Sequence, residues 1–153
     1  MRHLELKIPP PLVALLCVAA MWSLSRITPA LGLTKDIRWL LTGVFVLVGI
    51  SFDLRGLLVF FRARTSINPM KPNQASSLVV MGVYRRTRNP MYVGLASMLV
   101  AVAIFLDAPV ALIGVVAFVG YITLFQIQPE ERALGQKFGE AYREYCEQVP
   151  RWL

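Results

Sequence analysis

Apolar residues gather in four long stretches along the chain, and polar residues separate them. The stretches cover residues 12–33, 37–61, 91–106 and 110–127, and the second is nearly free of charge only up to residue 52. Each approaches the roughly 17–25 residues that an α-helix needs to cross a bilayer. The pattern predicts an all-α polytopic membrane protein with about four transmembrane helices, in one domain over residues 1–153.

The first stretch resembles a signal peptide in one respect, because Arg2 and Lys7 precede it. No cleavage site of small-x-small type follows, and the chain continues through Arg26 to Thr34 without one. We therefore expect a transmembrane helix that is retained in the protein.

The polar segments differ in kind. Residues 63–81 contain Asn68-Pro69 and Lys71-Pro72, which interrupt any helix and predict an ordered turn or a loop along the membrane surface. From Pro129 onward, apolar residues recur every three or four positions, which predicts a C-terminal amphipathic cytoplasmic helix. Gly135 and Gly139 weaken this helix by about 1 kcal/mol each relative to alanine, so they either permit a close approach or mark a break.

Composition and charge agree with a membrane protein. Hydrophobic residues make up 56% of the chain, against about 45–50% in soluble proteins. Of the cations that contribute to the net charge of +7, thirteen lie beside the two termini and in the central loop, and only Lys35 and Arg38 lie in the other loops. The positive-inside rule then places both termini in the cytoplasm, and we expect the cytoplasmic membrane of a prokaryote. This basic surface is expected to meet anionic lipid or an anionic cofactor, and no nucleic acid.

The positions of the cysteines and the histidine do not favour a metal site or a disulfide. Cys17 falls in the first apolar stretch and Cys146 in the tail, and the one histidine, His3, is near the N-terminus. This spacing offers no cluster of metal ligands and no base to activate a cysteine. We expect no metal site.

Two charged clusters are predicted to meet at the cytoplasmic surface. Asn89-Pro90 suits the start of a helix for two reasons. The side chain of Asn89 can accept a hydrogen bond from a backbone N–H, and proline has no N–H at a position where the helix provides no partner for one. The third stretch then leaves its helix N-terminus beside Arg85, Arg86 and Arg88, and the fourth returns Glu130 and Glu131 to the same surface. An alternative is that these residues are only interfacial anchors or a structural ion pair. Asp53 and Arg55 are expected to form a structural pair.

Such a pocket suits a zwitterion. A carboxylate can hold an ammonium group, and a cation or a helix N-terminus can hold a carboxylate. Tyr84, Tyr92 and Tyr142 add flat faces for a ring or a sulfonium. S-adenosylmethionine fits this description, as do other zwitterions, and the spacing does not distinguish them.

Two blocks of sequence carry a resemblance to a known family. Residues 82–94, GVYRRTRNPMYVG, and residues 130–152, EERALGQKFGEAYREYCEQVPRW, resemble motifs of the integral-membrane methyltransferases that include isoprenylcysteine carboxyl methyltransferases and phospholipid N-methyltransferases. The first block is similar to R-H/N-P-x-Y-x-G, and the second to E-E-x-x-L followed by F-G-x-x-Y and V-P. The resemblance covers residues 65–152 and implies a helical membrane enzyme that uses S-adenosylmethionine without a Rossmann domain.

The resemblance also implies roles for residues. Cofactor binding is expected at these positions: Tyr84, Arg88, Asn89, Tyr92, Gly94, Glu130, Glu131 and Tyr142. Asn89 stands where eukaryotic carboxyl methyltransferases have histidine, so that position can donate a hydrogen bond but cannot transfer a proton. Longer relatives continue beyond the position of Leu153, so part of the substrate site is expected to be absent or supplied by another chain.

The acceptor is expected to be a lipophilic or lipidated molecule that enters from the lipid, while the cofactor enters from the cytoplasm. Methyl transfer mainly needs alignment of the acceptor in a site without water. Arg85, Arg86 and Arg151 are candidates to align a carboxylate, and Glu131 is a candidate to accept an amine proton, although its favoured role is to hold the cofactor ammonium. Carboxyl methylation of the isoprenylcysteine type is preferred, lipid-amine N-methylation is the alternative, and a non-enzymatic transporter or assembly protein ranks third.

Overall fold

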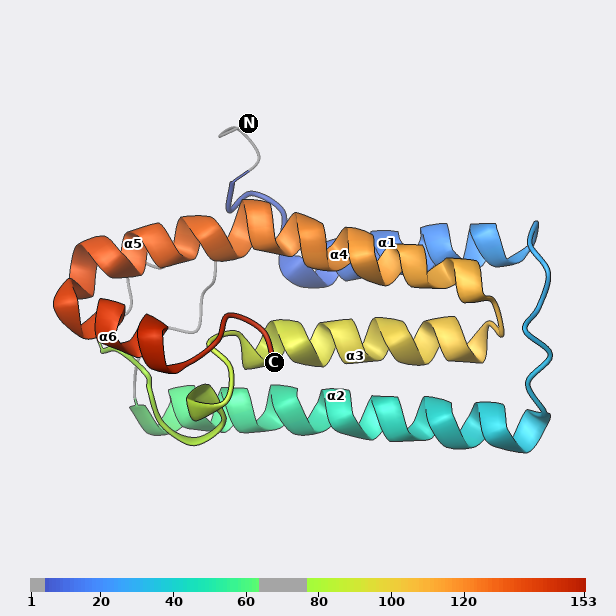
Figure 1. Cartoon of the computed structure of the whole chain (residues 1–153), viewed down its shortest axis with the longest axis horizontal. Coiled ribbons are helices and arrows are strands. Elements are labelled where there is room, and N and C mark those ends of the chain that lie inside the picture. The colour runs from blue at the N-terminus through green and yellow to red at the C-terminus, as the bar shows by residue number, and fades with distance from the viewer. Residues whose placement is uncertain (1–4, 64–76) are drawn as a thin grey trace.

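The computed structural model describes residues 5–63 and 77–153, and this part of the chain is helical and contains no strand. Four apolar helices run along the long axis of the molecule, and short helices join or extend them (Figure 1). In chain order they are α1 (Pro10–Ser25), α2 (Lys35–Ala63), η3 (Gly82–Arg85), α3 (Pro90–Phe105), η4 (Pro109–Ala111), α4 (Leu112–Ile122), η5 (Thr123–Ile127), α5 (Gln128–Phe138) and α6 (Glu140–Gln148).

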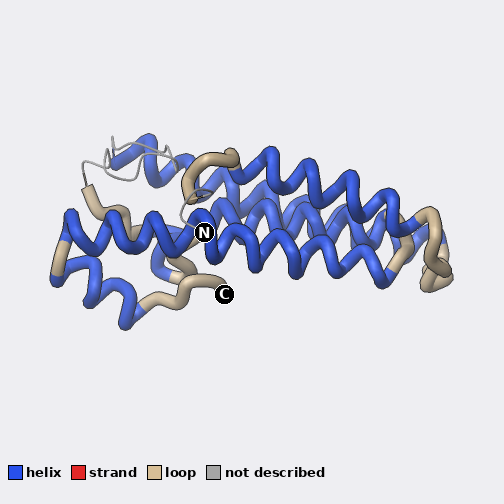
Figure 2. The backbone as a smooth tube through the Cα atoms, turned by 90° about the horizontal axis from the view of Figure 1, so that it is seen from above, coloured by secondary structure: helices blue, strands red, loops and turns tan. Residues whose placement is uncertain are grey.

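Neighbouring helices in the chain run in opposite directions, and α3 lies between α2 on one side and α1 with α4 on the other (Figure 1), while Figure 2 shows the bundle from above. α2 packs chiefly on α3, and α1 packs on α3 and α4. Glycine permits the closest approach, because a Cβ atom on Gly49 of α2 would lie 2.9 Å from the carbonyl oxygen of Gly94 on α3. The predicted all-α fold is confirmed.

The apolar helices differ in length. The segments Lys35–Phe61 and Pro109–Phe138 are long and apolar enough to cross a membrane, whereas Pro10–Ser25 and Pro90–Phe105 are shorter. A helix of 16 residues is about 24 Å long, somewhat less than a hydrocarbon core of about 30 Å. The structure thus supports two spans by length alone and is consistent with a membrane protein. The count of four spans stays a prediction.

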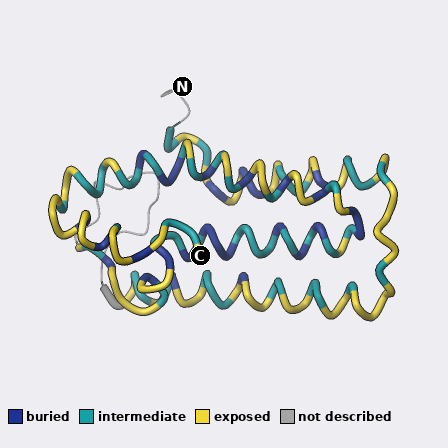
Figure 3. The backbone as a smooth tube through the Cα atoms, in the orientation of Figure 1, coloured by how far each residue is buried: buried dark blue, intermediate teal, exposed yellow. Residues whose placement is uncertain are grey.

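Large apolar side chains face outward on this bundle. Leu40 and Leu47 on α2 and Val116 on α4 are each about two-thirds or more exposed, at 67%, 68% and 72%. Figure 3 shows α2 with exposed positions along most of its length. A surface of this kind suits contact with lipid chains.

The first apolar stretch does not form one helix over residues 12–33. α1 ends at Ser25, and a segment without regular helix follows up to α2. The buried carboxylate of Asp107 accepts backbone N–H bonds from Gly32 and Leu33, each at 3.2 Å, and its carbonyl accepts one from Leu31. The prediction was wrong because this long-range bonding satisfies the backbone of an apolar segment that the local pattern assigns to a helix.

The tail also differs from one continuous helix. α5 ends at Phe138 and α6 begins at Glu140, with Gly139 between them at φ +54°. This backbone conformation favours glycine, so of the two expected roles for the tail glycines the structure selects a break at Gly139. The predicted apolar stripe is present, since Tyr142, Tyr145 and Val149 are buried together against Leu134 and Phe138. Asn68-Pro69 and Lys71-Pro72 lie outside the described residues.

Candidate cofactor site

One cation of the predicted arginine cluster, Arg88, meets the predicted carboxylate pair at one end of the bundle. η3, the start of α3, the helices α5 and α6 and the C-terminal segment all gather there (Figure 1). Arg88, just before α3, lies 3.1 Å from Glu131 on α5, measured from Nη1 to Oε1. The sequence separates these residues by about forty positions, and the fold joins them as expected.

Glu131 is held by two arginines. Arg151 donates from Nε to Oε1 at 2.9 Å and from Nη2 to Oε2 at 2.6 Å, a bidentate arrangement. The side chains of Arg88 and Glu131 are only 13% and 17% exposed, so this charge cluster is largely removed from water. The hydrogen bonds to Glu131 raise the pKa of Arg151 above its usual value. Two cations therefore share the carboxylate of Glu131.

Arg88 has donor capacity beyond its ion pair. Its Nη1 also donates to the thiol sulfur of Cys146 on α6, and its buried Nε has no hydrogen-bond partner. A buried donor without a partner is costly in a finished structure. It is the kind of atom that a ligand can satisfy.

Glu130 has different surroundings. Its Oε1 accepts the phenol O–H of Tyr92 at 2.6 Å and the side-chain N–H of Gln126 at 2.8 Å. Within the described chain, no hydrogen bond or ion pair reaches its other oxygen, Oε2. Glu130 is therefore a half-buried carboxylate that is fixed at one oxygen and free at the other.

Gln126 belongs to the site, although it lies outside both motif blocks of the sequence. Its side chain is 2% exposed, and it precedes Glu130 by four residues. It lies in η5, a π turn within the otherwise continuous helix from α4 to α5. Turns of this kind often occur at functional sites. A glutamine four positions before a glutamate, at the end of an apolar stretch, was the signal available in the sequence.

The segment before α3 clamps the C-terminal segment. The N–H of Arg88 donates to the carbonyl of Pro150 at 3.0 Å, and the amide of Asn89 donates to the carbonyl of Arg151 at 2.9 Å. The hydroxyl of Thr87, which is fully buried, donates to the same carbonyl at 3.2 Å. α3 does begin at Pro90, but the Asn89 side chain does not cap it, because its amide bonds to the C-terminal segment.

Three buried tyrosines lie near the cluster. Tyr142 and Tyr145 of α6 are buried, and the O–H of Tyr145 donates to the carbonyl of Tyr84 at 2.8 Å. The Tyr84 ring is buried against Phe60 of α2 in an edge-to-face contact. Burial raises the pKa of all three phenols, so they stay neutral donors.

Three of the predicted site residues lie apart from this cluster. Arg85 and Arg86 are exposed, and the latter faces a groove beside α2. Gly94 lies against α2, where a Cβ atom would come within 2.1 Å of Asp53 Oδ1. No ion pair joins Asp53 to Arg55 in the described residues, so that expected pair is wrong: positions i and i+2 face different sides of a helix. No group of three or more possible metal ligands lies together in residues 5–63 and 77–153.

The fold and the site together define a helical, apolar protein with a cation–carboxylate site at one end of its bundle. The sequence profile of the phospholipid methyltransferase family matches residues 37–141, which is more than half of the chain. The chain belongs to this family, and the predicted class, a methyltransferase, is confirmed. Its apolar helices and its family indicate a protein of the membrane.

Individual relatives agree with this membership. A protein-S-isoprenylcysteine O-methyltransferase of Xenopus laevis is 31% identical over 122 residues, which is 78% of this chain and 42% of that protein. Protein-S-isoprenylcysteine O-methyltransferase A of Arabidopsis thaliana is 29% identical over 106 residues, or 69% of this chain and 54% of that protein. An uncharacterized protein of Haemophilus influenzae is 43% identical over 63 residues, 41% of this chain and 100% of that protein. The chain thus spans about half the length of the two named enzymes, and no solved structure matches it.

Proposed function

We propose that this protein is a membrane-embedded methyltransferase that takes its methyl group from S-adenosylmethionine and gives it to a lipophilic acceptor. One observation carries the proposal: the two sequence blocks that resemble the family meet in space through Arg88, Glu131 and Arg151. A purely structural ion pair needs only one cation, whereas this site holds two cations beside a second carboxylate with a free oxygen.

The residues present fit the amino-acid part of the cofactor. The free Oε2 of Glu130 suits an ammonium group, while Tyr92 and Gln126 fix the orientation of the carboxylate. The unpartnered Nε of Arg88, with the N-terminus of α3, suits the cofactor carboxylate. Glu131 was expected to hold the ammonium. Because Arg88 and Arg151 already occupy it, we assign it the task of positioning these arginines.

The remaining predicted cofactor residues have supporting roles in this proposal. Tyr142 and Tyr84 provide buried aromatic walls, and Asn89 holds the C-terminal segment over the site. Gly94 acts at a distance, by letting α2 approach α3. When bound, S-adenosylmethionine supplies a methyl group activated by a sulfonium. The chain's own task is then to bind, to orient and to exclude water.

The acceptor is proposed to be a carboxylate of the isoprenylcysteine type, because both named relatives are protein-S-isoprenylcysteine O-methyltransferases. A carboxylate attacks the methyl group directly and needs a cation for alignment, and Arg151 is the candidate within the cluster. Arg85 and Arg86, which were expected to share this role, lie apart from the cluster, so we do not assign it to them. The second candidate is a lipid amine, which the family description, phospholipid methyltransferase, favours. An amine must lose a proton, and a carboxylate such as Glu131 would have to leave its arginines to accept it.

We place the site at the cytoplasmic face of a prokaryotic membrane, with both termini on that side. The cations concentrate in the sequence beside both termini and in the central loop, and this excess supports the orientation. Cofactor then reaches the site from water, and acceptor reaches it from lipid.

Binding of S-adenosylmethionine to detergent-purified protein tests the proposal. We expect Glu130→Gln to weaken binding about 10–150-fold, because a hydrogen bond to a charged group contributes about 1.5–3 kcal/mol. Glu140→Gln is the matched control, since Glu140 is exposed on α6 and its one ion pair among the described residues is with Arg143. Calorimetry gives the affinities, and thermal unfolding shows whether both variants fold. Equal affinity in the two variants would contradict the assignment.

Transfer itself distinguishes the acceptors. Protein is incubated with cofactor labelled in its methyl group and with either an S-prenylcysteine derivative bearing a free carboxylate or phosphatidylethanolamine. Label in the first compound, lost again on mild alkaline hydrolysis of the ester, supports carboxyl methylation. Alkali-stable label in the second supports N-methylation, and label in neither would contradict both.

A further inference from the structure

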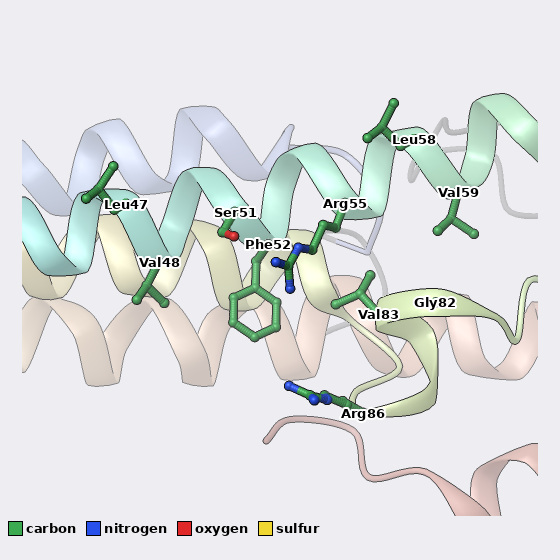
Figure 4. Close-up of a pocket in the computed structure, with 10 residues that line it drawn as sticks. All are labelled: Leu47, Val48, Ser51, Phe52, Arg55, Leu58, Val59, Gly82, Val83 and Arg86. Atoms are coloured by element: carbon green, nitrogen blue, oxygen red, sulfur yellow. The ribbon is translucent and has the colours of Figure 1, made fainter.

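A groove of about 690 Å³ runs beside α2, away from the cofactor site. One face of α2 forms one wall, and η3 forms the other (Figure 4). The lining is apolar over most of its length, with Val48, Phe52 and Leu58 among its residues, and it includes two arginines, Arg55 and Arg86. None of the residues that hold Glu130 or Glu131 lines it.

The two arginines converge from different elements. Arg55 extends from α2 and Arg86 from the end of η3, and Figure 4 shows both guanidinium groups reaching toward the space beside Phe52. Neither forms an ion pair with any residue in the described ranges. The acid nearest in sequence, Asp53, packs against Gly94 on α3 and therefore faces the bundle. Two guanidinium groups without counter-charges border an apolar channel.

The groove opens where lipid would lie. Leu47 and Leu58 on its wall are 68% and 53% exposed, and they continue the outward apolar surface of α2. Arg55 belongs to the C-terminal half of α2 and Arg86 directly follows η3, and the C-terminal end of α2 lies at the same end of the bundle as α5 and α6 (Figure 1). The apolar wall from Leu47 to Phe52 therefore leads to Arg55, in the order of the acyl chain and the headgroup of a membrane lipid at this interface.

We propose that this groove is a binding site for an anionic phospholipid, with its phosphate between Arg55 and Arg86 and an acyl chain along α2. Arginine suits the task because its planar guanidinium donates two parallel hydrogen bonds to phosphate oxygens. The bound lipid is a resident ligand, separate from the methyl acceptor. The site does not depend on the proposed reaction.

Native mass spectrometry of protein released from nanodiscs tests this site. The nanodiscs contain phosphatidylglycerol and phosphatidylcholine in equal amounts, and the measured quantity is the lipid that stays bound. We expect wild-type protein to retain phosphatidylglycerol selectively, and Arg55→Gln and Arg86→Gln each to lower retention about tenfold. Arg85→Gln is the matched control: it removes the same charge from the neighbouring position, which does not line the groove, and it should change retention less than about twofold.

The outcomes distinguish a specific lipid site at Arg55 and Arg86 from attraction of anionic lipid to the general positive charge of the surface. Equal losses in Arg85→Gln and Arg86→Gln would overturn the proposal, because diffuse surface charge would then explain binding. Displacement of the lipid by millimolar inorganic phosphate would also overturn it, since the site would then recognise free phosphate and no acyl chain. Circular dichroism and thermal unfolding establish that each variant is folded, and the lysine variants Arg55→Lys and Arg86→Lys should keep part of the retention.

Discussion

At the scale of single residues, the charges of the site explain one another. Arg88 and Glu131 are largely withdrawn from water, and a charge in that position is stable only with a partner. Glu131 provides that partner to Arg88 and to Arg151 together. The cluster is thus arranged before any ligand arrives, and a zwitterion would meet cations and a free carboxylate oxygen already in position.

The arginines before α3 should have different tasks. We expect Arg88→Ala to weaken S-adenosylmethionine binding about tenfold or more in nanodiscs of neutral lipid, because it removes a largely buried donor at the cluster. Arg85→Ala should leave that affinity within about twofold, because Arg85 is exposed and outside the cluster. Cofactor titration in neutral and in anionic nanodiscs measures both. Loss of binding in Arg85→Ala alone, in neutral lipid, would reverse the assignment.

At the scale of elements, the contact between α2 and α3 depends on a glycine facing a carboxylate. Gly94 belongs to the first sequence block, and Asp53 occupies the space that a side chain there would need. The same interface brings Gly49 against the Gly94 backbone. A motif glycine that was expected at the cofactor therefore acts by setting the distance between two helices.

This contact predicts a specific rescue. Gly94→Ala should lower the free energy of unfolding by about 1–3 kcal/mol, as overpacking does, because its Cβ would clash with Asp53. Adding Asp53→Ala should restore most of that loss, since all three nearest atoms to the new Cβ belong to Asp53. Thermal unfolding in detergent measures the stability of each variant.

Gly43→Ala is the control on the same helix, because nothing lies within 4 Å of a Cβ at that position. It should leave stability unchanged or raise it by up to about 1 kcal/mol through helix propensity. A loss in Gly43→Ala equal to that in Gly94→Ala would show that the clash with Asp53 is not the cause.

At the scale of the whole molecule, the bundle has a chemically distinct end. The cluster of Arg88 and Glu131, the clamp on the C-terminal segment and the helices α5 and α6 lie together at one end (Figure 1). The opposite end carries the segment between α1 and α2 and the turn at Asp107. Because α1 to α4 alternate in direction, the described cations just before α1, just before α3 and in α5 and α6 fall at the first end.

Orientation in the membrane follows from this arrangement. In a protein with Cys17→Ala and Cys146→Ala, a cysteine at exposed Gln136 on α5 should react with a membrane-impermeant maleimide only after cells are opened. A cysteine at exposed Lys35, at the start of α2, should react in intact cells. The labelling of intact and opened cells measures both positions. Labelling of position 136 from outside would contradict the cytoplasmic site.

The sequence by itself determined the features that depend on local order. Apolar stretches indicated helices, Asn89-Pro90 fixed the start of α3, the tail stripe indicated buried Tyr142 and Tyr145, and two motif blocks identified the family. These signals lie within one turn or one short segment, where helix periodicity and backbone chemistry act.

Tertiary structure alone decided which partner each polar group has. α1 ends at Ser25, and the backbone that follows it is hydrogen-bonded to Asp107. The side-chain amide of Asn89 donates to the carbonyl of Arg151. The tertiary structure also brought Gln126 to Glu130 and gave Glu131 a second arginine. The reason is physical: a buried polar group must be satisfied by whatever donor or acceptor the packing places nearby, and residues far apart in the chain supply most of these partners.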